Sequence, residues 1–303
     1  MTSQNTPTKL PNYGGQAVIE GVMMRGKRAA AIAMRNPEGE IVIHTETLSK
    51  FYQSKIIKIP FLRGLIGLWD ALVLGMKALT ISANTQTGED EKLEGAELFL
   101  TFSLSLAIAI GFFFLLPAGV GQLTERLLGW TAWMSNLTEG LVRLLLLVGY
   151  MWGIGRMEDI RRVFAYHGAE HKVINAFEQG AELTPQGVKP YSVEHPRCGT
   201  AFLLIVVLFS VLLFTALGPL TLGWRLLSRI LLLPVLTGIA YEYLRFTADH
   251  QKHPVIRQLI KPNLALQRLT TNEPTLEMLE VSLAAFQTMR QAEESPETIE
   301  ERS

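Results

Sequence analysis

Two long runs without a charged residue constrain this chain more than any other feature. Leu98–Leu116 and Thr200–Gly218 are built mainly from Leu, Ile, Val, Phe and Ala. As a helix, each run would be about 28 Å long, close to the hydrocarbon core of a bilayer at about 30 Å. Both runs are too long for core strands of a soluble protein. They therefore predict transmembrane helices.

Two further spans are predicted despite polar interruptions. Leu137–Gly155 carries Arg143 close to its start, where the guanidinium would have to extend toward the lipid headgroups. Leu226–Phe246 contains Pro234, which kinks or loosens a helix, and the acidic residue Glu242. We therefore expect a mainly α membrane protein with about four transmembrane helices.

The segment Phe61–Asn84 is apolar but interrupted by charges. Arg63, Asp70 and Lys77 recur every seven residues and would form one polar stripe on a helix. This pattern is typical of an amphipathic helix in the membrane interface or of a re-entrant helix. A complete transmembrane helix is the alternative that the sequence leaves open.

The N-terminal part predicts a small β region over residues 14–50. Glycines border Gly14–Gly26, which has the composition of a short strand between turns. Ala30–Met34 and Glu40–Thr45 flank a turn that contains Pro and Gly, and this arrangement predicts a β-hairpin. So small a sheet is not stable by itself, so we expect it to pack on the region around His167.

Composition and periodicity set the remaining boundaries. After Pro274, four apolar residues recur at helical spacing and predict a C-terminal helix: Leu276, Leu279, Leu283 and Phe286. The expected segments are a disordered N-terminus 1–13, an interfacial helix 61–84, a transmembrane core 98–246 with a loop 156–198, a soluble C-terminal segment 249–290 and a disordered tail 291–303.

Basic residues set the expected orientation. The loop 156–197 carries six Lys and Arg residues, whereas the loop between the first two spans holds only Arg126. Basic loops stay in the cytoplasm, so we expect a multi-pass protein of the inner (plasma) membrane with both termini and the 156–198 loop on the cytoplasmic side. Arg225 and Arg229, in the turn between the last two spans, run against this rule.

Charge and cysteine content exclude several classes of protein. The 28 Lys and Arg residues are balanced by 28 Asp and Glu residues, and no basic domain is present, so we expect no nucleic-acid binding. The single cysteine, Cys198, excludes an intrachain disulfide. The expected partner is the lipid bilayer, and a homo-oligomer is left open.

One motif points to chemistry. Arg156–Gly180 predicts a helix that leaves the second span and ends at Gly180. On it, His167 and His171 lie four residues apart and share one face, so that two imidazole nitrogens can converge on one cation. With Glu170, they form the string His-x-x-Glu-His, the inverted zinc-hydrolase signature. We therefore expect a divalent metal, zinc before others, with Glu170 as the catalytic base.

Candidates for a third metal ligand lie elsewhere in the chain. His195 and Cys198 follow in the string Glu-His-Pro-Arg-Cys, and Glu194 of that string could supply a carboxylate instead. Cys198 could equally be a small buried residue at the start of a span. Glu242 is predicted as a ligand or as a partner of a ligand, since a buried carboxylate needs a cation.

The partner of Glu242 and the location of the metal site each have an alternative. Glu242 could instead form an ion pair with Arg245 or Arg143. A second cluster, formed by Asp249, His250 and His253, has the composition of a surface loop.

Four stretches of the chain resemble one known family. They are Gly14–Gly26, His167–Lys172, Glu194–Thr200 and Leu266–Thr271, and they look like the YqhQ-like family of bacterial membrane proteins. The resemblance runs from Gly14 to about Phe286. It implies a membrane protein of unknown function that is described as a predicted metal-dependent enzyme. The family leads one to expect a basic residue after Thr271, where this chain has Asn272.

Two classes of function follow. In the first, His167, His171 and His195 hold the cation, and Glu170 activates water for attack on an amide, ester or phosphoester. In the second, the protein is a non-enzymatic membrane scaffold or transport-like protein with a structural metal or none. Four protein ligands are typical of structural zinc, and three of catalytic zinc, so the ligand count separates the two. The sequence indicates no substrate.

Overall fold

The computed structural model describes residues 13–48, 59–87 and 96–294, and the chain forms two compact units. Unit 1 comprises Met1–Ser54, Arg162–His195 and Thr271–Ser303, and unit 2 comprises Lys55–Arg161 and Pro196–Thr270. The expected disordered tails lie mostly outside the described residues. Two departures are visible at their edges: Tyr13 is buried, and the C-terminal helix continues to Glu294.

Unit 1 contains one antiparallel sheet of four strands in sequence order. The strands are β1 (Gly14–Val18), β2 (Gly21–Arg25), β3 (Ala29–Arg35) and β4 (Ile41–Thr47). The predicted hairpin is confirmed as β3 and β4, with Ala33 opposite Ile43. Gly39 ends its turn with φ 89°, a conformation that favours glycine.

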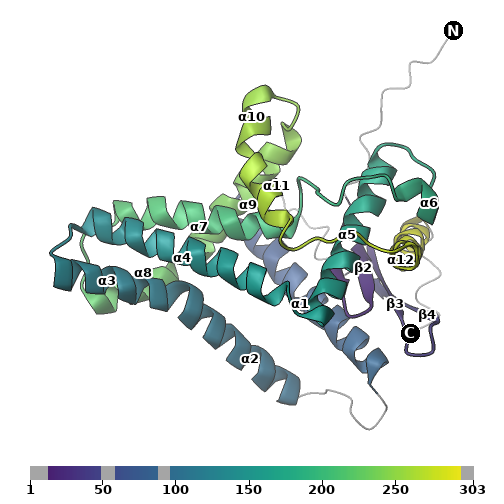
Figure 1. The fold of residues 1–303 in the computed structure, drawn as a ribbon, viewed down its shortest axis with the longest axis horizontal. Coiled ribbons are helices and arrows are strands. Elements are labelled where there is room, and N and C mark those ends of the chain that lie inside the picture. Colours follow the sequence, from purple (N-terminus) through teal and green to yellow (C-terminus); the bar gives the residue numbers. More distant parts are fainter. Residues whose placement is uncertain (1–12, 49–58, 88–95, 295–303) are drawn as a thin grey trace. The chain divides into compact units, whose positions relative to one another are not determined.

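Two long helices cover this sheet in one apolar core (Figure 1). They are α5 (Glu158–Glu178), which belongs to unit 1 from Arg162 onward, and α12 (Leu276–Glu294); the short α6 (Pro185–Val188) also packs on α12. Strand β3 is rich in alanine and buried, so its small side chains let α12 pack closely. Leu279, Leu283 and Phe286 of α12 are buried, as the predicted helical spacing requires, whereas Leu276 in its first turn is 40% exposed. The expected packing of the sheet on the His167 region is also confirmed, because Ala165, Tyr166 and Ala169 of α5 belong to this core.

The helix that was expected over 156–180 is interrupted at its start. Helix α4 ends at Ile154, Gly155 follows, and α5 begins at Glu158. Glu158 and Asp159 lie in the first turn of α5, where negative charge is favourable. The predicted end of the helix is confirmed, since Gly180 follows it with φ 71°.

Unit 2 is helical in its described residues. Its helices are α1 (Leu62–Gln86), α2 (Ala96–Ile110), the π-helical turn η4 (Gly111–Leu115), α3 (Leu116–Leu128), α4 (Ala132–Ile154), α7 (Gly199–Ala216), α8 (Leu222–Leu231), α9 (Leu233–Asp249), α10 (Pro254–Leu259) and α11 (Lys261–Gln267). Helix α7 packs against α4, α9 and α11.

Four of the described helices are long and apolar enough to cross a membrane. They are α1, the continuous Phe99–Leu128, α4 and α7, and the bent pair α8–α9 makes a fifth if it is one span. The expected mainly α fold with a small N-terminal sheet is confirmed. Helix α1, which was expected in the interface, has the length and composition of a span.

Proline explains both irregular places in these helices. Pro117 has no N–H to donate to the carbonyl of Phe113, four residues earlier. The turn η4 lies at this point, and Nε of Arg143 donates to the Phe113 carbonyl instead, at 2.9 Å. The second irregularity is a 45° bend between α8 and α9 at Leu232, just before Pro234, as the sequence predicted.

Arg143 departs from the expectation based on its position in the sequence. Since α4 begins at Ala132, the residue lies near the middle of the helix and not near its start. Its side chain is 1% exposed and pairs with Glu139 at 2.7 Å. The guanidinium is therefore satisfied inside the helical bundle and does not extend to headgroups.

Candidate metal centre

The motif on α5 places two imidazole rings side by side. His167 and His171 extend from the same side of the helix, with ring centroids 4.4 Å apart. His171 is buried, and 17% of the His167 side chain is exposed. A spacing of four residues is slightly more than one helical turn, which accounts for the shared face.

A backbone carbonyl fixes the orientation of His171. Its Nδ1–H donates to the carbonyl of Val193 at 2.5 Å. A histidine that ligates a metal commonly donates its other ring N–H in this way, which sets the tautomer. The arrangement leaves Nε2 of His171 with its lone pair available.

Polar side chains of α5 hold the loop that carries Val193. The Lys172 ammonium donates to the carbonyls of Lys189 (2.6 Å) and Tyr191 (2.7 Å). The Asn175 amide donates to the carbonyls of Ser192 and Glu194 at 2.8 and 3.0 Å. These four donations hold the loop 189–195 along α5.

His195 lies at the end of this loop. Its ring centroid is 5.8 Å from that of His171, and its side chain is 4% exposed. Its Nε2 lies 3.6 Å from Oε2 of Glu178. His195 is thus a third imidazole near the pair, with a carboxylate beside one of its nitrogens.

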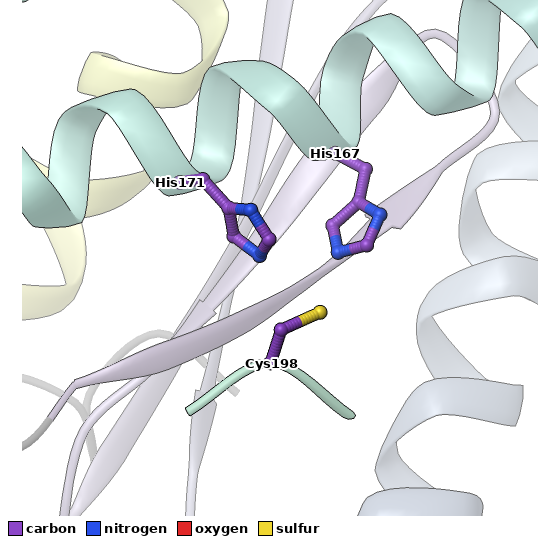
Figure 2. A group of neighbouring side chains, drawn as sticks. All are labelled: His167, His171 and Cys198. Carbon is purple, nitrogen blue, oxygen red and sulfur yellow. The ribbon is translucent and has the colours of Figure 1, made fainter. Parts of the chain in front are cut away.

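Cys198 follows His195 by three residues and is the N-cap of α7. Its sulfur accepts the backbone N–H of Thr200 at 3.4 Å, and the positive end of a helix favours negative charge there. Among the described residues, one group of three could hold a metal: the ligand atoms of His167, His171 and Cys198 all lie within 4.8 Å of one another. Figure 2 shows both rings extending from α5, with Cys198 on the same side.

Glu170 is buried next to the two histidines. Burial raises the pKa of its carboxyl to about 7, opposed by His167 and by the backbone N–H of Gly15. Oε2 of Glu170 lies 4.0 Å from Nε2 of His167. A Cβ at Gly15 would come within 2.9 Å of the Glu170 side chain, so β1 approaches this carboxylate closely because it has glycine there.

The other predicted residues have different partners. The Glu242 carboxylate accepts a bond of 2.7 Å from Nε of Arg63, a second from that guanidinium, and the Phe61 N–H at 3.1 Å. Its partner is therefore neither Arg245 nor Arg143. The second cluster is a chain of local contacts, in which His250 Nδ1 donates to the carbonyl of Phe246 at 2.8 Å.

Sequence reasoning missed the parts that position the histidines. The Val193 carbonyl and the close approach of Gly15 to Glu170 are main-chain features, which no residue type in the sequence reveals. Lys172 and Asn175 could have been noticed, since Asn175 continues the face of His167 and His171 at a further four residues. Glu20, between β1 and β2, lies outside this group: its carboxylate accepts two bonds from Arg162 at 2.6 and 2.5 Å.

The donor set fits a borderline-soft divalent cation. Two imidazole nitrogens and one thiolate are ligands that zinc prefers. Around a tetrahedral zinc ion such atoms lie about 3.3–3.6 Å apart. The three atoms here, all within 4.8 Å, are therefore close enough to converge with small side-chain rotations.

Comparisons with known proteins identify the family of the chain. The uncharacterized protein YqhQ of Bacillus subtilis (strain 168) is 35% identical over 291 residues, which cover 91% of this chain and 91% of YqhQ. No solved structure matches the chain. Residues 59–292 match a family of proteins of unknown function, DUF1385. The chain therefore belongs to the DUF1385 family.

Proposed function

We propose that this protein is a membrane-bound, metal-dependent hydrolase whose metal centre is formed by His167, His171 and Cys198. The observation that carries the proposal is the convergence of three ligand atoms within 4.8 Å, one of them on a histidine whose other nitrogen already donates to Val193. Three protein ligands leave a coordination position open, as in catalytic zinc sites.

The residues around the centre have distinct roles in this proposal. A bound divalent cation would supply Lewis acidity. Glu170 lies one residue before His171 and is held by Gly15, so it is positioned to accept a proton from water and to return it to a leaving group. His195, with Glu178 at its Nε2, would orient the end of the loop or serve as a fourth ligand.

Unit 1 is built from separate segments of the chain, and this supports four complete crossings of the membrane. Its core combines β2 and β3, α5 and α12, which come from three separate parts of the chain. These parts must lie on one side of the membrane, so the chain crosses an even number of times between them. Phe99–Leu128 with α4 gives two crossings, and α7 with the bent α8–α9 pair gives two more. Helix α1 would make the number odd, so we assign it to the membrane interface or to a re-entrant position.

Cysteine labelling tests this topology. In a Cys198→Ser background, single cysteines at Thr87, after α1, and at Gln186, in α6, should react with a membrane-impermeant thiol reagent only after the cells are opened. Labelling of both positions in intact cells would show that the orientation is opposite to the one proposed. Labelling of the Thr87 position alone would show that α1 crosses the membrane.

Metal analysis of variants tests the centre. Protein purified in detergent without a chelator should carry about one transition-metal ion per chain, and His171→Ala should lose most of it. His44→Ala is the matched control, because His44 is exposed on β4. Equal metal content in the His171→Ala variant and the wild type would contradict the proposal.

A second variant separates catalysis from structure. Glu170→Gln should retain the metal but lose function when it replaces the wild type in a deletion strain. Full function of Glu170→Gln would remove the catalytic role and favour a structural metal in a membrane scaffold.

A further inference from the structure

The first turn of α7 holds the sulfur of Cys198 through one residue, Thr200. The backbone N–H of Thr200 donates to Sγ of Cys198 at 3.4 Å, and Sγ donates to Oγ1 of the Thr200 side chain at 3.5 Å. A hydroxyl group both donates and accepts, so the Thr200 side chain can form a hydrogen bond with either a thiol or a thiolate. Two groups of Thr200 therefore bear on the position of this one sulfur.

A second threonine contacts the Thr200 hydroxyl. Oγ1 of Thr270 lies 3.3 Å from Oγ1 of Thr200, and it donates to the backbone carbonyl of Gln267 at 3.2 Å. The Thr270 hydroxyl has one proton, which goes to Gln267, so Thr270 accepts its bond from Thr200. Thr270 and Gln267 are 6% and 0% exposed, and water is thereby kept from these bonds. A chain of two hydroxyl groups thus runs from a buried carbonyl to the sulfur.

The packing of α11 on α7 brings Thr270 to this place. Thr270 follows the end of α11 by three residues, and α11 packs against α7. Near this end, Leu266 shares an apolar cluster with Leu204 of α7. Burial of these side chains stabilises the contact between the two helices. Thr270 is therefore held beside Thr200 by the fold itself, and the stretch Leu266–Thr271 gains a role next to the metal centre.

The same stretch continues to the helix that carries the two histidines. Asn272, two residues after Thr270, donates its backbone N–H to the carbonyl of Phe164 at 2.9 Å. Phe164 precedes His167 by three residues on α5. Residues 270–272 therefore form a hydrogen bond at each end, one toward the residue that holds the cysteine ligand and one to the helix of the histidine ligands.

We infer that Thr200 and Thr270 are positioning residues of the metal centre. Thr200 sets the direction of the Cys198 sulfur, and Thr270 sets the orientation of the Thr200 hydroxyl. The inference rests on the proposed function, because it requires a metal ion that Cys198 binds. Groups that hydrogen-bond to a metal ligand orient it and tune its donor strength, and their loss typically lowers metal affinity about 10–100-fold.

Cobalt(II) tests this role because a cobalt–thiolate bond gives a charge-transfer absorption band that reports on the sulfur alone. The full-length protein in detergent, freed of metal with a chelator that is then removed, is titrated with cobalt(II). A hydrogen bond to the thiolate lowers the energy of its lone pairs. Thr200→Val should therefore shift the band to longer wavelength and raise the Kd for cobalt about tenfold.

The second threonine and the conservative variants complete the set. Thr270→Val should change the band and the Kd in the same direction as Thr200→Val, because the Thr200 hydroxyl loses its partner. Thr200→Ser and Thr270→Ser keep the hydroxyl groups and should retain the wild-type band and Kd. Failure of both serine variants to do so would contradict a role of the hydroxyl groups.

Thr247→Val is the matched control for a loss of stability. Thr247 of α9 is 1% exposed, and its hydroxyl donates to the carbonyls of Tyr243 and Leu244. This variant also loses one buried hydroxyl, so a purely structural effect should appear in it as well, whereas the inference predicts an unchanged band and Kd.

Two results would overturn the inference and leave the metal centre in place. The first is an unchanged band and Kd in both Thr200→Val and Thr270→Val, and the second is the same change in Thr247→Val. The absence of a cobalt–thiolate band in the wild-type protein would instead contradict the proposed centre itself, and the inference with it.

Discussion

Gly168→Ala should destabilise unit 1, although alanine favours a helix. In the interior of a helix, alanine is more stable than glycine by about 1 kcal/mol. At this position, however, a Cβ would lie 2.1 Å from the carbonyl oxygen of Asn272 and 3.3 Å from Val193. Ordinary contact begins at 3.4 Å, so the Asn272 backbone would have to move by about 1.3 Å.

That movement would also disturb a hydrogen bond. The Asn272 N–H donates to the carbonyl of Phe164 on the same helix at 2.9 Å. Overpacking of about 1–3 kcal/mol and the loss of one hydrogen bond of about 1 kcal/mol outweigh the gain in helix propensity. We expect a net destabilisation of about 1–3 kcal/mol, which lowers the unfolding temperature of a unit of this size by about 5–15 °C.

Thermal unfolding in detergent, followed by circular dichroism, measures this effect. The matched control is Gly149→Ala in α4, where an added Cβ meets no atom within 4 Å. The control should be neutral or slightly stabilising. An equal or higher unfolding temperature for Gly168→Ala than for the wild type would refute the close approach of the Asn272 backbone to α5.

Three further substitutions test separate parts of the structure. Glu20→Gln should cost about 0.5–1 kcal/mol in unfolding free energy, because the pair with Arg162 is partly exposed. The hydrogen bonds from Arg162 lower the pKa of Glu20, so this stabilisation is present above the ordinary pKa of 4.5 and is lost as the pH falls through the lowered value. The stability–pH curve of the Glu20→Gln variant should lack this loss. Lys172→Met should cost about 2–3 kcal/mol and make the loop 189–195 sensitive to protease, whereas the exposed Lys189→Met should not. Glu139→Gln leaves the buried Arg143 and Arg229 uncompensated and should cost about 3–5 kcal/mol in urea-induced unfolding; a loss below about 1 kcal/mol would contradict these ion pairs.

Features encoded in a few neighbouring residues could be predicted from the sequence. The β3–β4 hairpin follows from alternation around a turn that ends in glycine, and α12 follows from the spacing of Leu279, Leu283 and Phe286. The bend near Pro234 follows from the missing N–H of proline. Each of these signals lies within one segment, so no knowledge of distant contacts is needed.

Features that depend on distant pairing could not be predicted. Arg143 looked like a residue that extends to headgroups, because the start of its helix was placed too late and its partner Phe113 lies 30 residues away. Glu242 was assigned toward the metal centre, yet its carboxylate is bound by Arg63, 179 residues earlier in the chain. A single sequence gives no information on which of several arginines meets a given carboxylate.

The residues of the candidate site are visible in the sequence, although the favoured third ligand was His195 and the structure groups Cys198 with the two histidines instead; the groups that support them are not visible. The spacing of His167 and His171 and the single Cys198 are visible in the sequence, and the structure brings these three side chains together. The carbonyl of Val193 and the backbone of Gly15, which orient His171 and Glu170, are main-chain groups that any residue possesses. Their roles arise only from the folding of the loop and the strand against α5.

The most direct test of the central claim is X-ray absorption spectroscopy of the zinc-loaded protein. The account predicts one sulfur neighbour at about 2.3 Å and nitrogen or oxygen neighbours at about 2.0–2.1 Å, completing a four-coordinate shell. In Cys198→Ser the sulfur shell should disappear, and in His167→Ala the imidazole scattering should decrease while the sulfur remains. A zinc spectrum without sulfur in the wild-type protein, or one unchanged by both substitutions, would contradict a metal centre formed by His167, His171 and Cys198.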